Sequence, residues 1–342
     1  MNLRGSVRAP VRQTHASGYA PVIWAYLARL DEIPCDIFIR NSRRVATLYA
    51  TVGAAPDTLR AKLADGVPLF IRASDVYLLR RMLTVSLDRA ISDRNLTPAA
   101  RSSEAYKITA SIVAQTFVGG HRFDADEESL VSDTVDLLTR VLSSDDEQLW
   151  SMVSVMQRNR TAHHRAINTA ICSLALATAS GISDFDRLRD IGRGALLLDL
   201  GMTTVPSRLG PASADRAQRD ALVDRAIRLH PSAGYAIITR ATGVVPSYAH
   251  IILEHHERLD GSGFPAGRKA GQISDDSQLV AITDTFTDLT TAGTEPEAPK
   301  PLTPFEALQR MRFEQVGQFN DELLKTFVRI LGGWDVVRQQ AA

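Results

Sequence analysis

The pattern of apolar and polar positions divides the chain into a short strand-rich part and a longer helical part. Apolar and polar residues alternate over 35–40 and 44–51, as in half-buried β-strands, and a further strand is predicted over 67–72. Farther along the chain, apolar residues recur at helical spacing, for example over 105–117 and 130–142. We therefore predict a mainly α protein, in which an all-α helical bundle follows a small α+β domain.

Shifts in charge coincide with these changes of pattern and suggest where domains begin and end. Basic residues outnumber acidic residues over the first hundred positions, and the reverse holds over the next fifty. We predict four segments: a disordered tail 1–17, a small α+β domain 18–95, a helical connector 96–150 and a helical domain 151–342. The small domain contains no catalytic constellation, so we expect it to act in sensing, docking or dimer contact.

Several acidic residues are placed to cap helices. Asp57 precedes a short predicted helix and Asp75 precedes a long amphipathic one. The acidic run 124–128 comes before the helix predicted over 130–142, and we interpret it as a charged cap with a solvated face. The run lacks the glycine and the spacing of a calcium loop, which argues against a metal site there.

Composition narrows the functional classes. The chain has 342 residues, with 39 Lys and Arg against 39 Asp and Glu. A net charge of zero argues against a protein that coats DNA or RNA and against a polybasic membrane anchor. Two distant cysteines, Cys35 and Cys172, form no disulfide framework and suggest a reducing compartment. The apolar run 171–177 is too short to cross a bilayer, so we expect a cytoplasmic protein.

The candidate chemistry lies in histidines and aspartates of the helical region. A single histidine is usually structural, but several on separate predicted helices together indicate a metal site. Imidazole and carboxylate suit Fe, Mn or Zn, and converging helices are a known frame for dinuclear sites. The candidate ligands are His163, His164, Asp199, His230, His255, His256 and Asp284.

One motif is long and specific. The sequence His255-His256-Glu257-Arg258-Leu259-Asp260-Gly261-Ser262-Gly263-Phe264-Pro265 resembles the HHExxDGxGYP signature of the HD-GYP phosphohydrolases, bacterial phosphodiesterases that hydrolyse cyclic di-GMP. Phe264 stands where the family has tyrosine. By resemblance, the loop is also a candidate surface for protein partners, formed by Glu257, Asp260, Gly261, Gly263, Phe264 and Pro265.

The resemblance extends over about 151–335. His163-His164 resembles the start of the family's first histidine-bearing helix, with a register ambiguous by one residue. His230-Pro231 resembles the HPxxG element, and the segment ending at Asp284 resembles the helix with the last aspartate ligand. Four prolines over 293–304 predict a loop, and 319–331 is similar to the closing helix.

The resemblance implies two metal subsites that share Asp199, the candidate catalytic residue. One subsite would combine His230, His255 and His256 with Asp199. The other would combine His163 or His164 with Asp199 and Asp284.

The chain also departs from the family at positions that carry chemistry. In the family's His-Asp (HD) pair, Leu198 replaces the histidine before Asp199, and Met202 replaces the lysine that follows. Neither side chain can coordinate a metal or donate a proton in that way. The glutamate of trinuclear members is absent at Asn159 and Arg160, and Glu295 lies where basic residues are expected. We therefore expect one divalent ion (Fe, Mn or Zn), a weakened pair, or none.

Three functional hypotheses follow. The first is a pseudoenzyme: a degenerate HD-GYP protein, weak or inactive as a phosphodiesterase, that binds a cyclic dinucleotide and protein partners as a regulatory module in bacterial signalling. The alternative is an active, atypical cyclic di-GMP phosphodiesterase, a hydrolase that attacks the phosphodiester bond with metal-bound water. In the third, the histidines are structural parts of an interaction scaffold. A homodimer and a monomer both remain open.

Overall fold

The computed structural model describes residues 18–22, 24–28, 30–40, 46–60, 67–116, 123–144, 156, 162–204, 216–291 and 300–340. The predicted tail 1–17, the connection around Arg43 and Arg44, and most of the proline-rich loop lie outside these residues. Within them, the protein is mainly helical with one small sheet, which confirms the predicted fold class.

The N-terminal part contains a four-stranded antiparallel sheet of order β1-β4-β2-β3. Phe38 pairs with Phe70 across β2 and β4, and the Phe38 ring meets Tyr19 edge to face at 5.0 Å. The prediction anticipated three of the strands and missed β1, which contains Pro21. The elements of this part are β1 (Tyr19–Val22), α1 (Trp24–Leu27), β2 (Ile37–Arg40), β3 (Ala46–Ala50), α2 (Pro56–Arg60) and β4 (Leu69–Arg72).

The predicted caps of this part are only partly present. Asp57 lies in the first turn of α2 rather than before it, because the helix begins at Pro56. Asp75 is the N-cap residue of α3 (Val76–Ser92), but its side chain makes no capping bond. It accepts a hydrogen bond from the Ser74 hydroxyl instead, at 3.0 Å, and a short 3₁₀ turn, η2 (Ala73–Asp75), leads into the helix.

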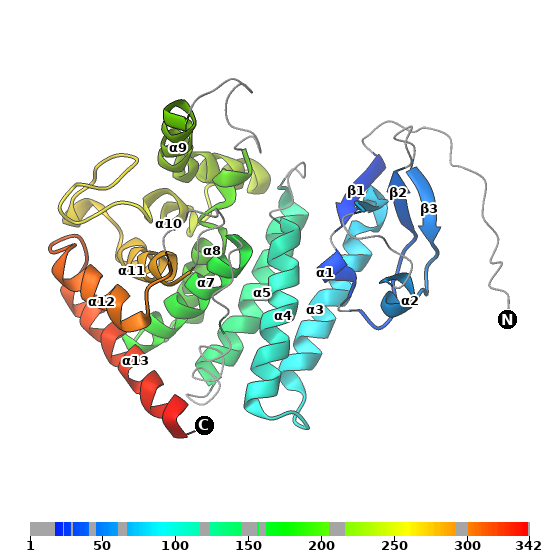
Figure 1. The fold of residues 1–342 in the computed structure, drawn as a ribbon, viewed down its shortest axis with the longest axis horizontal. Helices are drawn as coiled ribbons and strands as arrows, with labels where there is room; N and C mark the ends of the chain where they lie inside the picture. Colours follow the sequence, from blue (N-terminus) through cyan, green and yellow to red (C-terminus); the bar gives the residue numbers. More distant parts are fainter. Residues whose placement is uncertain are drawn as a thin grey trace.

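Three long helices, α3, α4 (Pro98–Thr116) and α5 (Ala125–Ser144), stand side by side between the sheet and the C-terminal helices (Figure 1). At the start of α5, the Asp124 side chain accepts from the Glu127 amide and the Glu127 carboxylate accepts from the Asp124 amide. This reciprocal pair is a capping box, so the predicted charged cap is confirmed. The predicted solvated face is wrong in part, since Glu127 is buried and Glu128 accepts a hydrogen bond from Tyr248.

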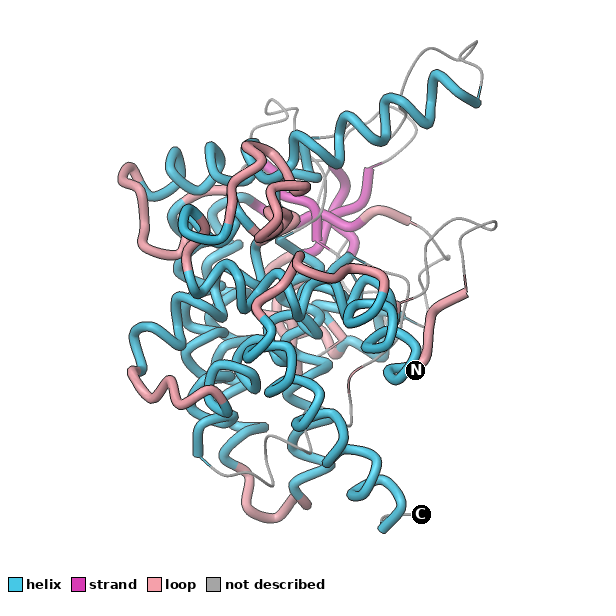
Figure 2. The backbone as a smooth tube through the Cα atoms, turned by 90° about the vertical axis from the view of Figure 1, so that its left-hand side faces the viewer, coloured by secondary structure: helices cyan, strands magenta, loops and turns pink. Residues whose placement is uncertain are grey.

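The C-terminal part is a layered helical bundle, with α9 running along its upper edge and projecting beyond it (Figures 1 and 2). Its elements are α7 (Ala162–Ala179), α8 (Phe185–Leu197), η3 (Leu200–Thr204), α9 (Arg216–Thr242), α10 (Ala249–Glu254), η4 (Ala270–Gln272), α11 (Asp275–Thr290), α12 (Pro304–Phe313) and α13 (Asp321–Gln340). The most buried helices, α7 and α11, pack against each other, with Thr169 meeting Thr287 and Ser173 meeting Thr283 through hydroxyl hydrogen bonds.

Buried apolar side chains form one continuous core from Ala20 to Leu331. No helix among the described residues is long and apolar enough to cross a membrane. The division into the domains 18–95, 96–150 and 151–342 stays a prediction, since the core runs through all three.

Candidate metal centre

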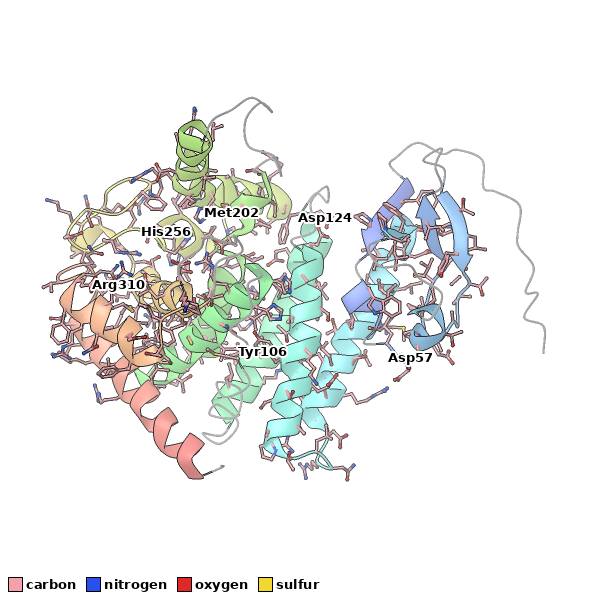
Figure 3. The ribbon with its side chains drawn as sticks, in the orientation of Figure 1. Asp57, Tyr106, Asp124, Met202, His256 and Arg310 are labelled. Atoms are coloured by element: carbon pink, nitrogen blue, oxygen red, sulfur yellow. The ribbon has the colours of Figure 1, made fainter. Side chains whose placement is uncertain are left out.

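Three histidines converge at the junction of α9 and α10. His230 lies within α9, and His255 and His256 directly follow the last residue of α10. One ligand nitrogen from each of the three lies within 4.8 Å of the others, and no further such group of histidine, cysteine or acidic residues is found among the described residues. The Nε2 atoms of His230 and His255 are 3.0 Å apart. Figure 3 labels His256 in this region.

Pro231 fixes the orientation of His230. A proline has no backbone N–H, so the Ile227 carbonyl, four residues earlier in α9, receives no helical hydrogen bond from position 231. The Nδ1 of His230 lies 2.6 Å from that carbonyl oxygen. Since a carbonyl can only accept, Nδ1 carries the proton and Nε2 keeps its lone pair.

His255 is oriented in the same way. Its Nδ1 lies 2.8 Å from the carbonyl of Ile252, which is in the last turn of α10, where carbonyls lack helical donors. Two Nε2 lone pairs therefore face each other at 3.0 Å with no proton between them. Outer-sphere carbonyls that orient imidazoles in this way are typical of metal-binding histidines.

Burial keeps the three imidazoles neutral. It lowers the pKa of His255 to about 3, with a further contribution from neighbouring His230. Burial also lowers the pKa values of His230 and His256. Neutral imidazoles with converging lone pairs are the form that coordinates a divalent ion. The residues present thus fit a metal, with His230, His255 and His256 as nitrogen donors.

Asp199 lies beside this cluster, at the turn between α8 and η3. Its Oδ1 is 3.5 Å from the Nε2 of His230. The turn packs directly onto α9, because a Cβ at Gly201 would lie 2.0 Å from the carbonyl oxygen of His230. Glycine at 201 thus permits the close approach that brings Asp199 to His230.

The other oxygen of Asp199 faces a residue that the sequence analysis missed. Arg165, near the start of α7, donates one guanidinium N–H to Asp199 Oδ2 and another to Asp284 Oδ1, the latter at 2.8 Å. Asp288 adds an exposed carboxylate 3.7 Å from the same guanidinium. A sequence signal existed: Arg165 is a charged residue immediately before the apolar run of a buried helix.

The three charged groups are almost enclosed, with side-chain exposures of 17% for Arg165, 6% for Asp199 and 1% for Asp284. Burial alone would raise the pKa of Asp199, but the Arg165 guanidinium holds that pKa below its usual value. Burial raises the pKa of Asp284, and Arg165 only partly opposes this shift. The cation is thus bonded to two carboxylates that would otherwise be buried without a countercharge.

His163 and His164 immediately precede Arg165 on α7, but they are not part of the histidine cluster. Their rings contact each other at 4.4 Å, and the His164 ring stacks on Tyr106 of α4 (Figure 3) at 6.0 Å. Burial lowers the pKa of both. The group of candidate ligands found among the described residues includes neither of them. This arrangement does not favour either histidine as the partner of Asp199 and Asp284.

Comparison with known proteins agrees with the motifs. The family model described as HD domain matches residues 136–323, more than half of the chain. The chain belongs to the HD domain family. A cyclic di-GMP phosphodiesterase from Pseudomonas aeruginosa is 27% identical over 206 residues, covering 60% of this chain and 48% of the relative. Another from Thermotoga maritima is 27% identical over 176 residues, covering 51% and 45%. The chain thus spans about half the length of these curated relatives.

The fold agrees as well. The solved structure of Bd1817, described as a HDG"Y"P protein from Bdellovibrio bacteriovorus, matches with a TM-score of 0.66 at 18% identity, covering 92% of this chain and 99% of that chain. At that identity the likeness shows the fold. The matched family and relatives bear out the predicted resemblance to the HD-GYP group.

By the resemblance described above, Leu198 and Met202 are expected to replace a histidine and a lysine of the HD-GYP site. Leu198 is fully buried in the apolar core. Met202 is half-buried in η3, and its amide donates to the Asp199 carbonyl at 2.8 Å (Figure 3). Hydrocarbon and thioether side chains thus stand at the positions where the family has histidine and lysine.

The HD-GYP motif loop is organised by its own polar residues. The buried Glu257 carboxylate accepts from the amides of Ala266 and Arg268 at 2.7 and 2.8 Å. Asp260 accepts from the Ser262 amide at 2.9 Å, and Gly261 adopts a φ of 84°. Glu257 and Asp260 therefore shape the loop by hydrogen bonds within it.

Three further motif residues set the position of the loop. A Cβ at Gly263 would lie 2.4 Å from the His256 carbonyl, so this glycine allows the loop to pack on the histidine segment. The Phe264 ring lies 4.5 Å from that of His256, and Pro265 is exposed. The predicted use of this loop as a partner surface stays a prediction.

Proposed function

We propose that this HD-GYP chain is a degenerate module that binds a cyclic dinucleotide and hydrolyses it weakly or not at all. The proposal rests on the asymmetry around Asp199: its Oδ1 lies 3.5 Å from His230 of the histidine cluster, while its Oδ2 is bonded to Arg165. One metal subsite is thus supported. A pair of ions would clamp the attacking and leaving oxygens of a phosphodiester together, and a single subsite supports this arrangement poorly.

The histidine cluster gives the binding role its chemistry. A divalent ion held there would supply positive charge for a phosphate oxygen. The chain's own groups orient the imidazoles, exclude water around them and place the Asp199 carboxylate at their edge. With Met202 in place of a lysine, no side-chain ammonium is available at that position to stabilise a leaving oxygen.

Most cations near the motif are already bonded within the protein. The Arg258 guanidinium donates to the carbonyls of His255 and Glu257 and to Thr285. Arg268 is paired with Glu254. Arg228 of α9 also pairs with an acid, Asp224, at 3.1 Å, but both side chains of this pair are exposed, at 60% and 66%. The Arg228 guanidinium lies 5.5 Å from the centroid of the Phe264 ring. We propose that Arg228 contacts the phosphate or base of the ligand.

Calorimetry with cyclic di-GMP tests this function. The full chain loaded with Mn²⁺ is expected to bind, and Arg228→Ala is expected to weaken binding about tenfold, since a hydrogen bond to a charged group contributes about 1.5 kcal/mol or more. Arg310→Ala is the matched control, because Arg310 is also exposed and pairs with an acid four residues away, but on α12. The absence of any heat of binding from the wild-type chain would contradict the proposal.

The second candidate is an active, atypical phosphodiesterase, favoured by the complete histidine cluster beside Asp199. The two candidates differ in the rate at which the protein hydrolyses cyclic di-GMP, which can be measured. We further propose that the motif loop binds protein partners, and that the protein is cytoplasmic and forms a homodimer.

A further inference from the structure

Arg165 occupies the place where a second cation would be needed. Its guanidinium touches Asp199 Oδ2 and Asp284 Oδ1, and Asp288 lies 3.7 Å away. These carboxylates come from two segments: the turn after α8 for Asp199, and two successive turns of α11 for Asp284 and Asp288. Arg165 itself comes from a third segment, the start of α7. The cation therefore joins segments that are far apart in the sequence.

The contact has the features of a built site. Asp199 and Asp284 are buried, and two buried carboxylates without a cation would be costly. Carboxylate oxygens are also ligands that Fe, Mn and Zn accept. Arg165 donates to one oxygen of each carboxylate, so the same oxygens are not free to coordinate an ion.

Two further features oppose an ion at this position. A divalent cation placed between these carboxylates would lie within a few ångströms of a permanent positive charge, in a site of low polarity where repulsion is strong. Leu198, next to Asp199, offers a hydrocarbon side chain and no ligand atom. The residues on the Arg165 side of Asp199 therefore do not fit a metal, whereas those on the histidine side do.

We propose that Arg165 is a tethered cation that takes the place of a second metal ion and limits the chain to a single ion at the histidine cluster. The inference deepens the proposed function and rests on it for the identity of the site. Arg165 limits the chain to one ion because its guanidinium neutralises Asp199 and Asp284 without offering an open coordination position. It is a positioning residue, since it holds Asp199 so that Oδ1 faces His230.

The test is the number of Mn²⁺ ions per chain, measured by elemental analysis after loading with excess Mn²⁺ and desalting. The double variant Arg165→His/Leu198→His offers two imidazoles to the two carboxylates and is expected to gain one ion relative to wild type. The single variant Leu198→His is the matched control: it adds a ligand but keeps the guanidinium, so it is expected to gain none.

Three results would overturn the proposal: two ions in the wild-type chain, a gain in Leu198→His alone, or no gain in the folded double variant. If wild type holds no ion and the double variant gains one, the role of Arg165 stands while the metal at the histidine cluster fails. Loss of cyclic di-GMP binding, measured separately, concerns the proposed function only.

If the variants at position 198 do not fold, the melting temperatures of variants at position 165 alone test the proposal. In Arg165→Ala the two buried carboxylates lose their cation, so the melting temperature should fall in EDTA and recover with Mn²⁺ by more than in wild type. Arg165→Lys keeps a positive charge and should respond to Mn²⁺ as the wild-type chain does. An equal Mn²⁺ response in wild type and Arg165→Ala would contradict the proposal.

Discussion

At the scale of single residues, the histidine cluster depends on a proline that has no polar side chain. Pro231 removes the amide that would bond the Ile227 carbonyl, and His230 Nδ1 uses that carbonyl instead. The side chain is thereby held with Nε2 directed at His255. A helix interior that accepts proline gives up about 3 kcal/mol of helix stability, which indicates that the residue serves the site rather than the fold.

Replacing this proline should separate stability from metal affinity. In Pro231→Ala the restored amide competes for the Ile227 carbonyl, so we expect weaker Mn²⁺ binding by about tenfold or more, as for other outer-sphere changes. The same change should raise the melting temperature, since alanine is the better helix former. Mn²⁺ titration and thermal melts of both chains measure the two effects.

Pro304→Ala is the control for this substitution, because Pro304 is in the first turn of α12, where its missing amide has no partner to lose. Its Mn²⁺ affinity should equal that of the wild-type chain. An unchanged affinity in Pro231→Ala would show that the Ile227 contact does not orient His230.

At the scale of elements, the sequence predicted most helices and strands, but not which side chain of each helix points into the metal centre. An α-helix turns about 100° per residue, so a shift of one or two positions changes which side chain points inward. The motif drew attention to His163 and His164, whereas α7 directs Arg165 at Asp199. Sequence periodicity gave no means to choose among three adjacent residues, since the choice depends on where α8 and α11 place their carboxylates.

Other elements were predictable because their signals are local. The capping box at Asp124 and the positions of His230 and Asp284 follow from short motifs. Strand β1 was missed; it contains Pro21, which weakens a strand signal.

The contact between η3 and α9 gives a prediction at the same scale. In Gly201→Ala the added methyl would meet the backbone carbonyl of His230, which cannot move without shifting α9. We expect a loss of about 1–3 kcal/mol in the free energy of unfolding, as for other overpacked sites, together with weaker metal binding. Denaturant unfolding with and without Mn²⁺ measures both.

Gly271→Ala provides the comparison, since a Cβ there would meet nothing within 4 Å. It should unfold at nearly the denaturant concentration of the wild-type chain. If Gly201→Ala unfolded there too, the close approach of η3 to α9 would not be what places Asp199.

At the scale of the whole molecule, the metal centre is assembled from α7, the end of α8, α9, the end of α10 and α11. It combines a neutral histidine cluster with a carboxylate cluster closed by an arginine, and Asp199 lies between the two, bonded to Arg165 and 3.5 Å from His230. The sequence identified the family and the histidine cluster because their motifs are contiguous. It did not reveal the internal cation, which no motif contains.

We propose that this HD-GYP site binds cyclic di-GMP without efficient turnover. The most direct measurement is hydrolysis of cyclic di-GMP by the pure, Mn²⁺-loaded chain, followed by chromatography of the products. We expect the wild-type chain to bind cyclic di-GMP and to form little or no linear dinucleotide, and His255→Ala to form no less product than the wild-type chain does. Robust hydrolysis by the wild-type chain that disappears in His255→Ala would contradict it.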